Sequence, residues 1–139
     1  MTERAAPAAT RQLARQVYAH FNERDIDGLL ALAAPDIEWD WSRSIGPDAG
    51  VQHGTEAVRR FLCANWEHWE SIEIVPQELL EAGEEIIVFV AVRLRGRDGI
   101  EVEARGPHVQ TWRDGRLTRY RLFQDRAEAL AAVGLRNSE

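Results

Sequence analysis

The chain of 139 residues is 45% hydrophobic, which suits one domain with a single core, so no second domain is expected. Its formal net charge of −6 at pH 7 argues against a nucleic acid as partner, because such binding depends on basic groups that neutralise phosphates. All 17 cationic residues are Arg, and the absence of Lys excludes a lysine Schiff base and the lysine of a phosphate-binding loop.

The N-terminal stretch MTERAAPAAT contains no apolar run of signal-peptide length, and no later segment is long enough to span a membrane. We therefore expect a soluble, cytoplasmic protein without membrane partners. The expected organisation is a flexible N-terminus over residues 1–9, a single domain over residues 10–134 and a C-terminal tail over residues 135–139.

Two helices are predicted next. Apolar residues recur at spacings of three and four after Thr10, which is an N-cap residue type, and they predict a helix over residues 10–22. A second, short helix is predicted within residues 25–36, where Asp25 caps the start and Pro35 blocks continuation.

The stretch DIEWDW, residues 36–41, alternates apolar and acidic residues and predicts a half-buried strand. Its apolar side chains share one face, and Asp40 falls on the other face, toward solvent. The Gly, Pro, Ser and Asp content of residues 42–50 then predicts a loop.

A third helix is predicted over residues 55–69. Its apolar face contains one polar residue, Asn65, among Val58, Phe61, Leu62, Trp66 and Trp69. The chain's one cysteine, Cys63, cannot form an intramolecular disulfide, and its place in this helix favours packing over nucleophilic chemistry.

Four strands are predicted over residues 72–81, 85–95, 100–112 and 116–124. Asp-Gly pairs at positions 98–99 and 114–115 are hairpin signals, so these strands form an antiparallel meander. Asp125 and Glu128 form a capping-box pattern that opens a last short helix, which Gly134 ends.

Helices followed by long antiparallel strands predict an α+β domain with its helices on one face of the sheet, and the strand at residues 36–41 joins that sheet. Pro107 cannot donate a ladder hydrogen bond, so a bulge or an edge position is expected there. A bulge would re-aim the next side chain, which is His108.

The order of these elements and several stretches of sequence resemble the nuclear transport factor 2-like superfamily, specifically its SnoaL-like branch of polyketide cyclases and ketosteroid isomerases. The stretches, within residues 10–133, are NERDIDGLLALAAPDIEWDW, HGTEAVRRFL and GPHVQTWRDGRLTRYRLFQDRAEAL. The resemblance implies a cone-shaped, curved antiparallel sheet with three N-terminal helices on its concave face, a deep apolar pocket and a homodimer. The scaffold hosts isomerases, cyclases, hydrolases, dehydratases and non-catalytic binders, so it does not fix the activity.

Ketosteroid isomerases use a carboxylate base and two oxyanion donors. Matched to this sequence, the tyrosine donor falls on Val17, with Tyr18 one place away, and the base falls on Trp41, with Asp40 beside it. The second donor, a protonated aspartate, falls on His108. All three positions differ, so we do not expect steroid-type isomerisation by that mechanism.

His108 is the first candidate for a catalytic proton donor or acceptor in the pocket. The alternative is a half-buried structural histidine that is bonded to a backbone carbonyl. Asp40 is a second catalytic candidate if the strand register slips by one residue. The candidate substrate-binding residues are Val17, Tyr18, Trp39, Trp41, Phe61, Trp66, Tyr120, Leu122 and Gln124. Tryptophans in a small domain more often belong to the core. We therefore assign the other two, Trp69 and Trp112, to packing or the dimer face.

The other histidines give no metal-ligand spacing, so neither a metal nor another cofactor is expected. His20 and His68 lie beside charged residues on helices and are assigned to the surface. His53 lies where the family usually has a pocket-rim residue, but a surface role is favoured.

Two functions remain open. One is a cofactor-independent isomerase, cyclase, hydratase or hydrolase that transfers protons on a small apolar or aromatic molecule, and the other is a non-catalytic binder of such molecules. A second titratable residue near His108 would favour the enzyme, and Asp40, Asp125 and His53 are the candidates.

The stretch IIVFVAV is apolar on both strand faces, with Ile86, Val88 and Val90 on one face and Ile87, Phe89 and Ala91 on the other. This is more than a solvated face needs, and it favours a homodimer built largely on the outer face of the sheet. Elsewhere on that face, arginines are expected to pair across strands with Glu101 and Glu103.

Overall fold

The computed structural model describes residues 7–45 and 48–135. The predicted flexible N-terminus and C-terminal tail lie largely outside this range, although the first helix begins at Pro7, ahead of the predicted Thr10. The elements in chain order are α1 (Pro7–Asn22), α2 (Ile26–Ala31), β1 (Ala33–Asp40), β2 (Val51–His53), α3 (Thr55–His68), β3 (Trp69–Ala82), β4 (Glu85–Gly96), β5 (Glu101–Arg113), β6 (Arg116–Leu122) and α4 (Arg126–Ala132).

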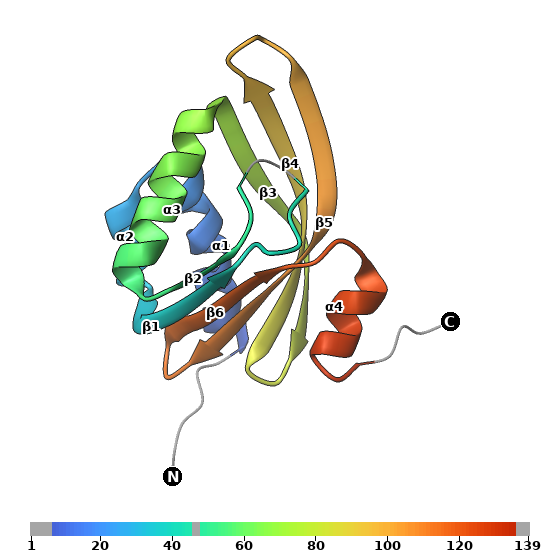
Figure 1. Ribbon diagram of the computed structural model, residues 1–139. Coiled ribbons are helices and arrows are strands. Elements are labelled where there is room, and N and C mark those ends of the chain that lie inside the picture. Colours follow the sequence, from blue (N-terminus) through green and yellow to red (C-terminus); the bar gives the residue numbers. More distant parts are fainter. Residues whose placement is uncertain (1–6, 46–47, 136–139) are drawn as a thin grey trace.

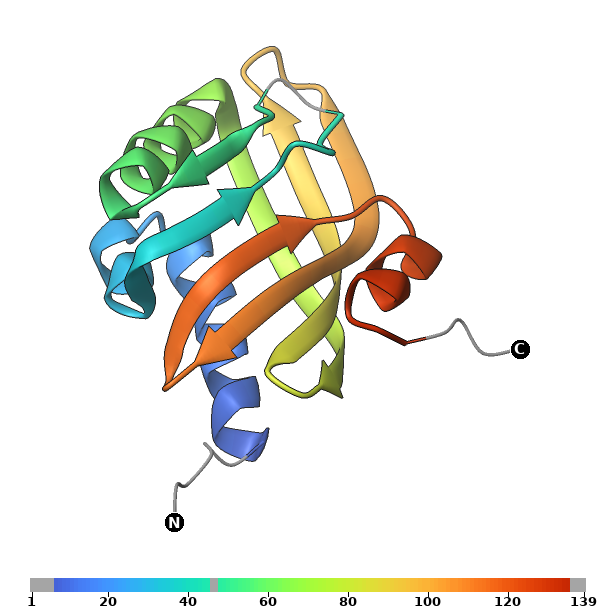
Figure 2. The same ribbon diagram turned by 60° about the horizontal axis from the view of Figure 1, so that its bottom comes forward.

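The six strands form one curved sheet in the order β2-β1-β6-β5-β4-β3. The last four strands make the predicted antiparallel meander, and α1, α2 and α3 lie together on one side of the sheet (Figure 1). The architecture is therefore the expected α+β arrangement. Figure 2 shows how β5 and β6 bend, so that the sheet wraps around α1.

The sheet is mixed, which corrects the expectation of a fully antiparallel sheet. β1 runs parallel to β6, and β2 pairs antiparallel with β1. The reason lies in how the chain enters β1, because the residue before it, Leu32, accepts a hydrogen bond from the backbone of Leu117 at the start of β6. The three-residue β2 was not predicted, since a strand this short carries no readable alternation.

Pro107 occupies an edge-like position and not a bulge. The β4–β5 register runs unbroken through it, and the β5–β6 pairing begins only at the next residue, where His108 faces Leu122. On the β6 side the Pro107 carbonyl still accepts a hydrogen bond from the backbone N–H of Phe123 (3.0 Å), and the missing N–H leaves only the reciprocal bond unmade, at the end of the ladder. His108 is directed by ordinary strand alternation.

The main core lies between the helices and the concave face of the sheet. It includes Tyr18 and Phe21 from α1, Leu62 from α3, and Trp39 and Tyr120 from the adjacent strands β1 and β6. In both α1 and α3, the buried face is the apolar face predicted from the sequence, whose residues recur every three or four positions.

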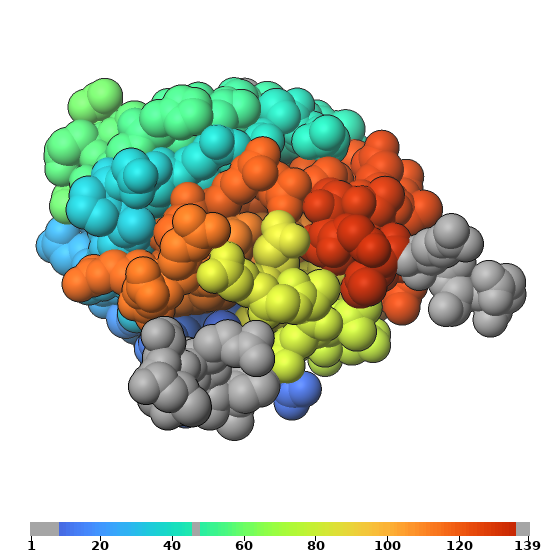
Figure 3. Space-filling view, turned by 90° about the horizontal axis from the view of Figure 1, so that it is seen from below, coloured from blue at the N-terminus to red at the C-terminus, as the bar shows by residue number. Residues whose placement is uncertain are grey.

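A second, smaller core lies on the outer face of the sheet, where α4 packs (Figures 1 and 3). Ile87 and Val109 are fully buried beneath Ala129 and Leu130 of this helix. The chain thus covers part of the apolar surface that motivated an outer-face dimer. The predicted cross-strand ion pairs also form on this face, from Arg93 to Glu103 (3.6 Å) and from Arg95 to Glu101 (2.8 Å).

Within the described residues, no helix is long and apolar enough to cross a membrane.

Candidate functional site

A cavity of about 340 Å³ lies between the concave face of the sheet, the C-terminal end of α3 and the segment that follows β1. Its volume is at the lower end of the range of small-molecule pockets, roughly 300–1,000 Å³. Most of its wall is apolar, and the lining residues are Trp41, Ser44, Ile45, Asp48, Asn65, Trp69, Ile72, Ile74, Val92, Leu94, Val102, Ala104, Arg105, Gly106, His108, Leu122, Phe123 and Gln124.

His108 reaches this cavity from the concave face of β5 and is only 4% exposed. Its ring nitrogen Nδ1 lies 2.5 Å from the hydroxyl of Tyr120, so its partner is a side chain and not the backbone carbonyl of the alternative prediction. No hydrogen bond to Nε2 occurs within the described residues, which leaves this nitrogen available to a ligand. Burial lowers the pKa of His108 to about 3, so the imidazole is neutral at physiological pH.

A network of buried polar side chains continues from His108 into the core. The hydroxyl oxygens of Tyr120 and Tyr18 lie 3.2 Å apart, and the Gln110 side chain interacts with Tyr18 in turn. Burial raises the pKa of both tyrosines, so both phenols keep their protons. Tyr18 and Tyr120, two predicted substrate-binding residues, therefore lie behind His108 and do not line the cavity.

A second polar group faces the same cavity. Asp48 accepts a hydrogen bond from Asn65 Nδ2 (2.7 Å), and its Oδ2 lies 2.9 Å from Nδ1 of His68. Asp48 is the one carboxylate among the described lining residues, and half of the His68 side chain is exposed to solvent. The pair therefore connects the cavity wall to water.

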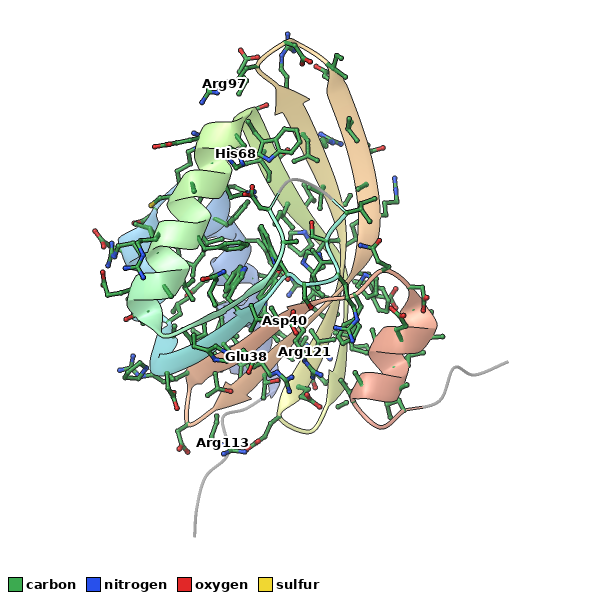
Figure 4. The ribbon with its side chains drawn as sticks, viewed as in Figure 1. Glu38, Asp40, His68, Arg97, Arg113 and Arg121 are labelled. Atoms are coloured by element: carbon green, nitrogen blue, oxygen red, sulfur yellow. The ribbon has the colours of Figure 1, made fainter. Side chains whose placement is uncertain are left out.

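Asp40, the second catalytic candidate, does not line the cavity. Its Oδ1 accepts hydrogen bonds from the backbone N–H (2.9 Å) and the hydroxyl (2.6 Å) of Ser42. Figure 4 shows Asp40 near Arg121, its register partner on β6, and Arg121 forms a 2.7 Å ion pair with Glu85. As the alternation predicted, Asp40 lies on the face of β1 opposite the tryptophans, although it is buried and not solvated.

Of the candidate substrate-binding residues Trp39, Trp41, Phe61 and Trp66, Trp41 lines the cavity. The expectation that Trp39, Phe61 or Trp66 would also touch the cavity was wrong, because Trp41 stands in front of Phe61 (5.5 Å between ring centroids) and Trp39 (5.8 Å). These rings fix the orientation of Trp41. Trp66 packs on Phe21, deeper in the core.

The remaining candidates divide between the cavity and its surroundings. Leu122 and Gln124 line the cavity, and Gln124 also donates a hydrogen bond to the backbone of Arg43. Val17 is buried in the core behind the cavity. His53 is exposed on β2, away from the cavity lining.

Among residues 7–45 and 48–135, no group of three or more His, Cys, Asp or Glu side chains is placed to hold a metal ion.

Sequence reasoning missed most of the cavity residues as site residues, among them Asn65, Trp69 and Asp48. Asn65 was visible as the one polar residue on the apolar face of its helix, and Trp69 lay at the end of that same face. Asp48 had no signal, because it lies in a loop of polar residues and only the fold brings it against α3.

Three comparisons place these features among known proteins. The family model of the SnoaL-like domain matches residues 14–120, whereas no curated protein matches the chain. An NTF2-like protein of unknown function from Burkholderia pseudomallei is 28% identical, with a TM-score of 0.75 over 91% of this chain and 98% of that one. TerC, co-crystallised with polyporic acid, is 24% identical, with a TM-score of 0.75 over 90% of this chain and 97% of that one. Rv0760c from Mycobacterium tuberculosis, in complex with estradiol-17beta-hemisuccinate, is 21% identical, with a TM-score of 0.71 over 83% of this chain and 92% of that one.

Proposed function

Because the chain belongs to the SnoaL-like domain family, we propose that its cavity binds a small, largely apolar or aromatic molecule and catalyses proton transfer next to a carbonyl group. The observation that carries the proposal is the pairing of two unlike groups in one apolar cavity. A neutral imidazole, His108, and one carboxylate, Asp48, both face it.

In the proposed reaction, the Asp48 carboxylate takes a proton from the carbon beside the carbonyl. The electron pair of the broken C–H bond forms a C=C bond, and the carbonyl electrons move onto the oxygen, which becomes an enolate. His108 binds this oxygen through its available Nε2, because a neutral imidazole can polarise a carbonyl. In a β,γ-unsaturated carbonyl compound, return of the proton from Asp48 to the γ-carbon completes an isomerisation. The enolate carbon can instead attack a second carbonyl and close a ring, and the alkoxide oxygen formed there takes the proton from Asp48.

His68 gives Asp48 a connection to solvent. Its ring contacts the carboxylate on one side and water on the other, so it can exchange the proton that Asp48 gains. Asn65 holds the carboxylate from a second direction and is itself only 4% exposed. Both contacts favour one orientation of the proposed base.

The apolar wall supports the same function. Trp41 and Trp69, with aliphatic side chains of β3, β4 and β5, exclude water from the ligand. In such surroundings a hydrogen bond to a developing negative charge is stronger than in water. Two structural neighbours were crystallised with small organic molecules, a class of ligand that agrees with this cavity.

One observation favours the alternative, a non-catalytic binder. The pKa of His108 lies far below neutral, and its ring is tied to buried tyrosines, as expected also of a histidine that only supports the fold. The two functions differ in whether a bound ketone exchanges its α-protons with solvent.

The test uses 2-tetralone, an aromatic bicyclic ketone, in D₂O. We expect the wild-type protein to accelerate exchange of its α-protons for deuterium, followed by ¹H NMR, above the rate in buffer. Asp48→Asn should lower the catalysed rate about 100-fold or more because the base is lost. His108→Ala should lower it about 100-fold because the enolate loses its partner.

The matched control is Asp36→Asn, because Asp36 is exposed on β1 and does not line the cavity. This variant should exchange protons at the wild-type rate. Line broadening of 2-tetralone without accelerated exchange would assign the cavity to the non-catalytic alternative.

We also retain as proposals a homodimer through the outer face of the sheet and a cytoplasmic location. The dimer is supported by the apolar pattern of β4 on that face, where Phe89 stays half exposed at the margin of the cluster covered by α4, with Arg126 over its ring.

A further inference from the structure

The long direction of the cavity follows strand β5. Its wall includes Val102, Ala104, Gly106 and His108, which are alternate residues of the strand and therefore share its concave face. At about 3.3 Å per residue, the strand covers roughly 20 Å between Val102 and His108. A bicyclic ketone such as 2-tetralone is much shorter than this, so it would occupy only part of the cavity.

Exposure rises along this row of side chains. His108 is buried and Gly106 is half-buried, whereas Ala104 and Val102 are exposed. Val102 is the second residue of β5, next to the turn that joins β4 and β5 and extends beyond the end of α3 (Figure 1). The cavity is therefore closed at His108 and open at Val102.

Small residues leave room along the row between its two ends. Gly106 has no side chain, and Ala104 has a single methyl group. Apolar side chains of β3 and β4 form the adjoining wall, and these are Ile72, Ile74, Val92 and Leu94. The space along β5 is thus an apolar channel that leads from His108 to the surface.

The open end of the channel is apolar although it faces water. Val102 lines it together with Ile45, which is 91% exposed, and Ile100 is exposed two positions before Val102. Single exposed apolar residues are ordinary, but these three lie at or beside one opening and continue an apolar cavity. Their arrangement indicates an apolar occupant.

A ligand fits this opening better than a protein. Three side chains expose far less than the roughly 800 Å² per partner that a stable protein–protein interface buries. The apolar wall also runs without interruption from the cavity to Val102, so a molecule held inside can extend over the opening.

We propose that the ligand is a carbonyl compound with a flexible apolar chain. Its carbonyl lies at His108, and the chain passes Gly106 and Ala104 and leaves the cavity between Ile45 and Val102. The chain is flexible because β5 bends between its two ends (Figure 2), and a rigid ring system of this length cannot follow the bend. The place of the carbonyl rests on the proposed function, whereas the path of the chain rests on the shape of the cavity.

The test compares 2-hexanone with 2-undecanone, which differ only in chain length. Each is titrated into the full ¹⁵N-labelled chain at neutral pH, and binding is followed by ¹H–¹⁵N correlation NMR. We expect 2-undecanone to bind at least about 30-fold more tightly, because each buried methylene group adds up to a factor of about four. Equal affinities would overturn this inference alone, whereas binding of neither ketone would overturn it together with the proposed function.

Two matched variants test the opening. Val102→Asp should weaken the binding of 2-undecanone about 10-fold, the contribution of one or two methylene contacts, and leave that of 2-hexanone unchanged. Val51→Asp is the control, because Val51 is exposed to a similar degree (40% against 49% for Val102) but lies on β2 and does not line the cavity. Equal effects of the two variants on 2-undecanone would overturn the inference.

A third variant, Ala104→Trp, should obstruct the channel between its ends. Because Ala104 is exposed, the larger ring does not have to fit into the core. We expect 2-undecanone to lose its advantage while 2-hexanone, which reaches only part of the channel, still binds. Loss of both ketones, or of neither, would contradict the proposed path.

Two further measurements separate the other occupants. The rigid ketone 2-acetylanthracene should bind more weakly than 2-undecanone, and tighter binding that Val102→Asp weakens would overturn the flexible chain. Val102→Asp should also keep the wild-type mass in sedimentation velocity, since a lower mass would assign the opening to contacts between copies of the chain. A failure of proton exchange on 2-tetralone would leave all these affinities unaffected.

Discussion

The indole ring of Trp39 stacks on the ring of Tyr120, with centroids 4.1 Å apart and planes 6° from parallel. The two residues are register partners in the parallel pair β1–β6, so the stack follows from the strand pairing. Tyr120 is also the hydrogen-bond partner of His108. The stack therefore connects the pairing of two strands distant in sequence to the geometry of the cavity wall.

Trp39→Ala should lower the free energy of unfolding by about 3–5 kcal/mol, because Trp39 is almost fully buried and the change leaves a large cavity. Urea denaturation followed by far-UV circular dichroism measures this loss. Trp69→Ala is the comparison, and it should cost less because Trp69 is only half-buried at the cavity wall. A loss below about 1 kcal/mol for Trp39→Ala would contradict the assigned role of the stack.

Protonation of His108 should destabilise the protein at low pH. Its pKa is about 3 in the folded chain and 6.5 for an unperturbed histidine, so the unfolded chain binds the proton more tightly in that range. Stability should be unaffected by His108 above pH 6.5 and should fall as the pH drops toward 3, by at most about 1.4 kcal/mol per pH unit.

The variant His108→Gln removes this titration and should flatten stability against pH between 6.5 and 3, as measured by urea denaturation at each pH. His53→Gln is the control, because His53 is exposed on β2. The prediction fails if both variants keep the wild-type slope.

Asp40→Asn should leave proton exchange on 2-tetralone at the wild-type rate, in contrast to Asp48→Asn. Asp40 does not line the cavity, and its carboxylate serves the turn at Ser42. The variant should lose about 1 kcal/mol of stability, typical of one weakened hydrogen bond. A large loss of exchange with wild-type stability would return Asp40 to the catalytic site.

His68→Gln should slow the same exchange about 10-fold while changing stability by less than about 0.5 kcal/mol, because the side chain is half exposed but contacts the proposed base. His20→Gln is the matched control. His20 also contacts a carboxylate, that of Asp25 (3.1 Å), but it lies on α1 away from the cavity lining. Equal rates for the two variants would exclude a role of His68 in proton exchange.

The protein should sediment as a dimer at micromolar concentration. Replacement of Phe89 on the outer face by Glu should shift it to monomer, because a charge in an apolar interface is costly to desolvate. Glu103→Gln, at the exposed part of the sheet, should leave the dimer unchanged. A wild-type monomer in sedimentation velocity would end this proposal.

The sequence by itself determined the kinds of elements and most of their order. The Asp-Gly pairs specified the two hairpins, since such turns need a positive φ, and Gly99, Asp114 and Gly115 have one. Helical periodicity identified the buried faces of α1 and α3. The family resemblance and the bulge expected at Pro107 placed His108 in the pocket. The structure has no bulge there, and ordinary strand alternation directs the side chain to the concave face.

Only the tertiary structure decided which polar groups meet. Tyr18 and Tyr120 are 102 positions apart, and Asp48 reaches Asn65 and His68 from a loop without a local pattern. The parallel pairing of β1 with β6 likewise depends on where α2 delivers the chain. Local propensities act over a few residues, whereas these contacts depend on how the sheet curves around the helices, and that curvature is a property of the packed chain.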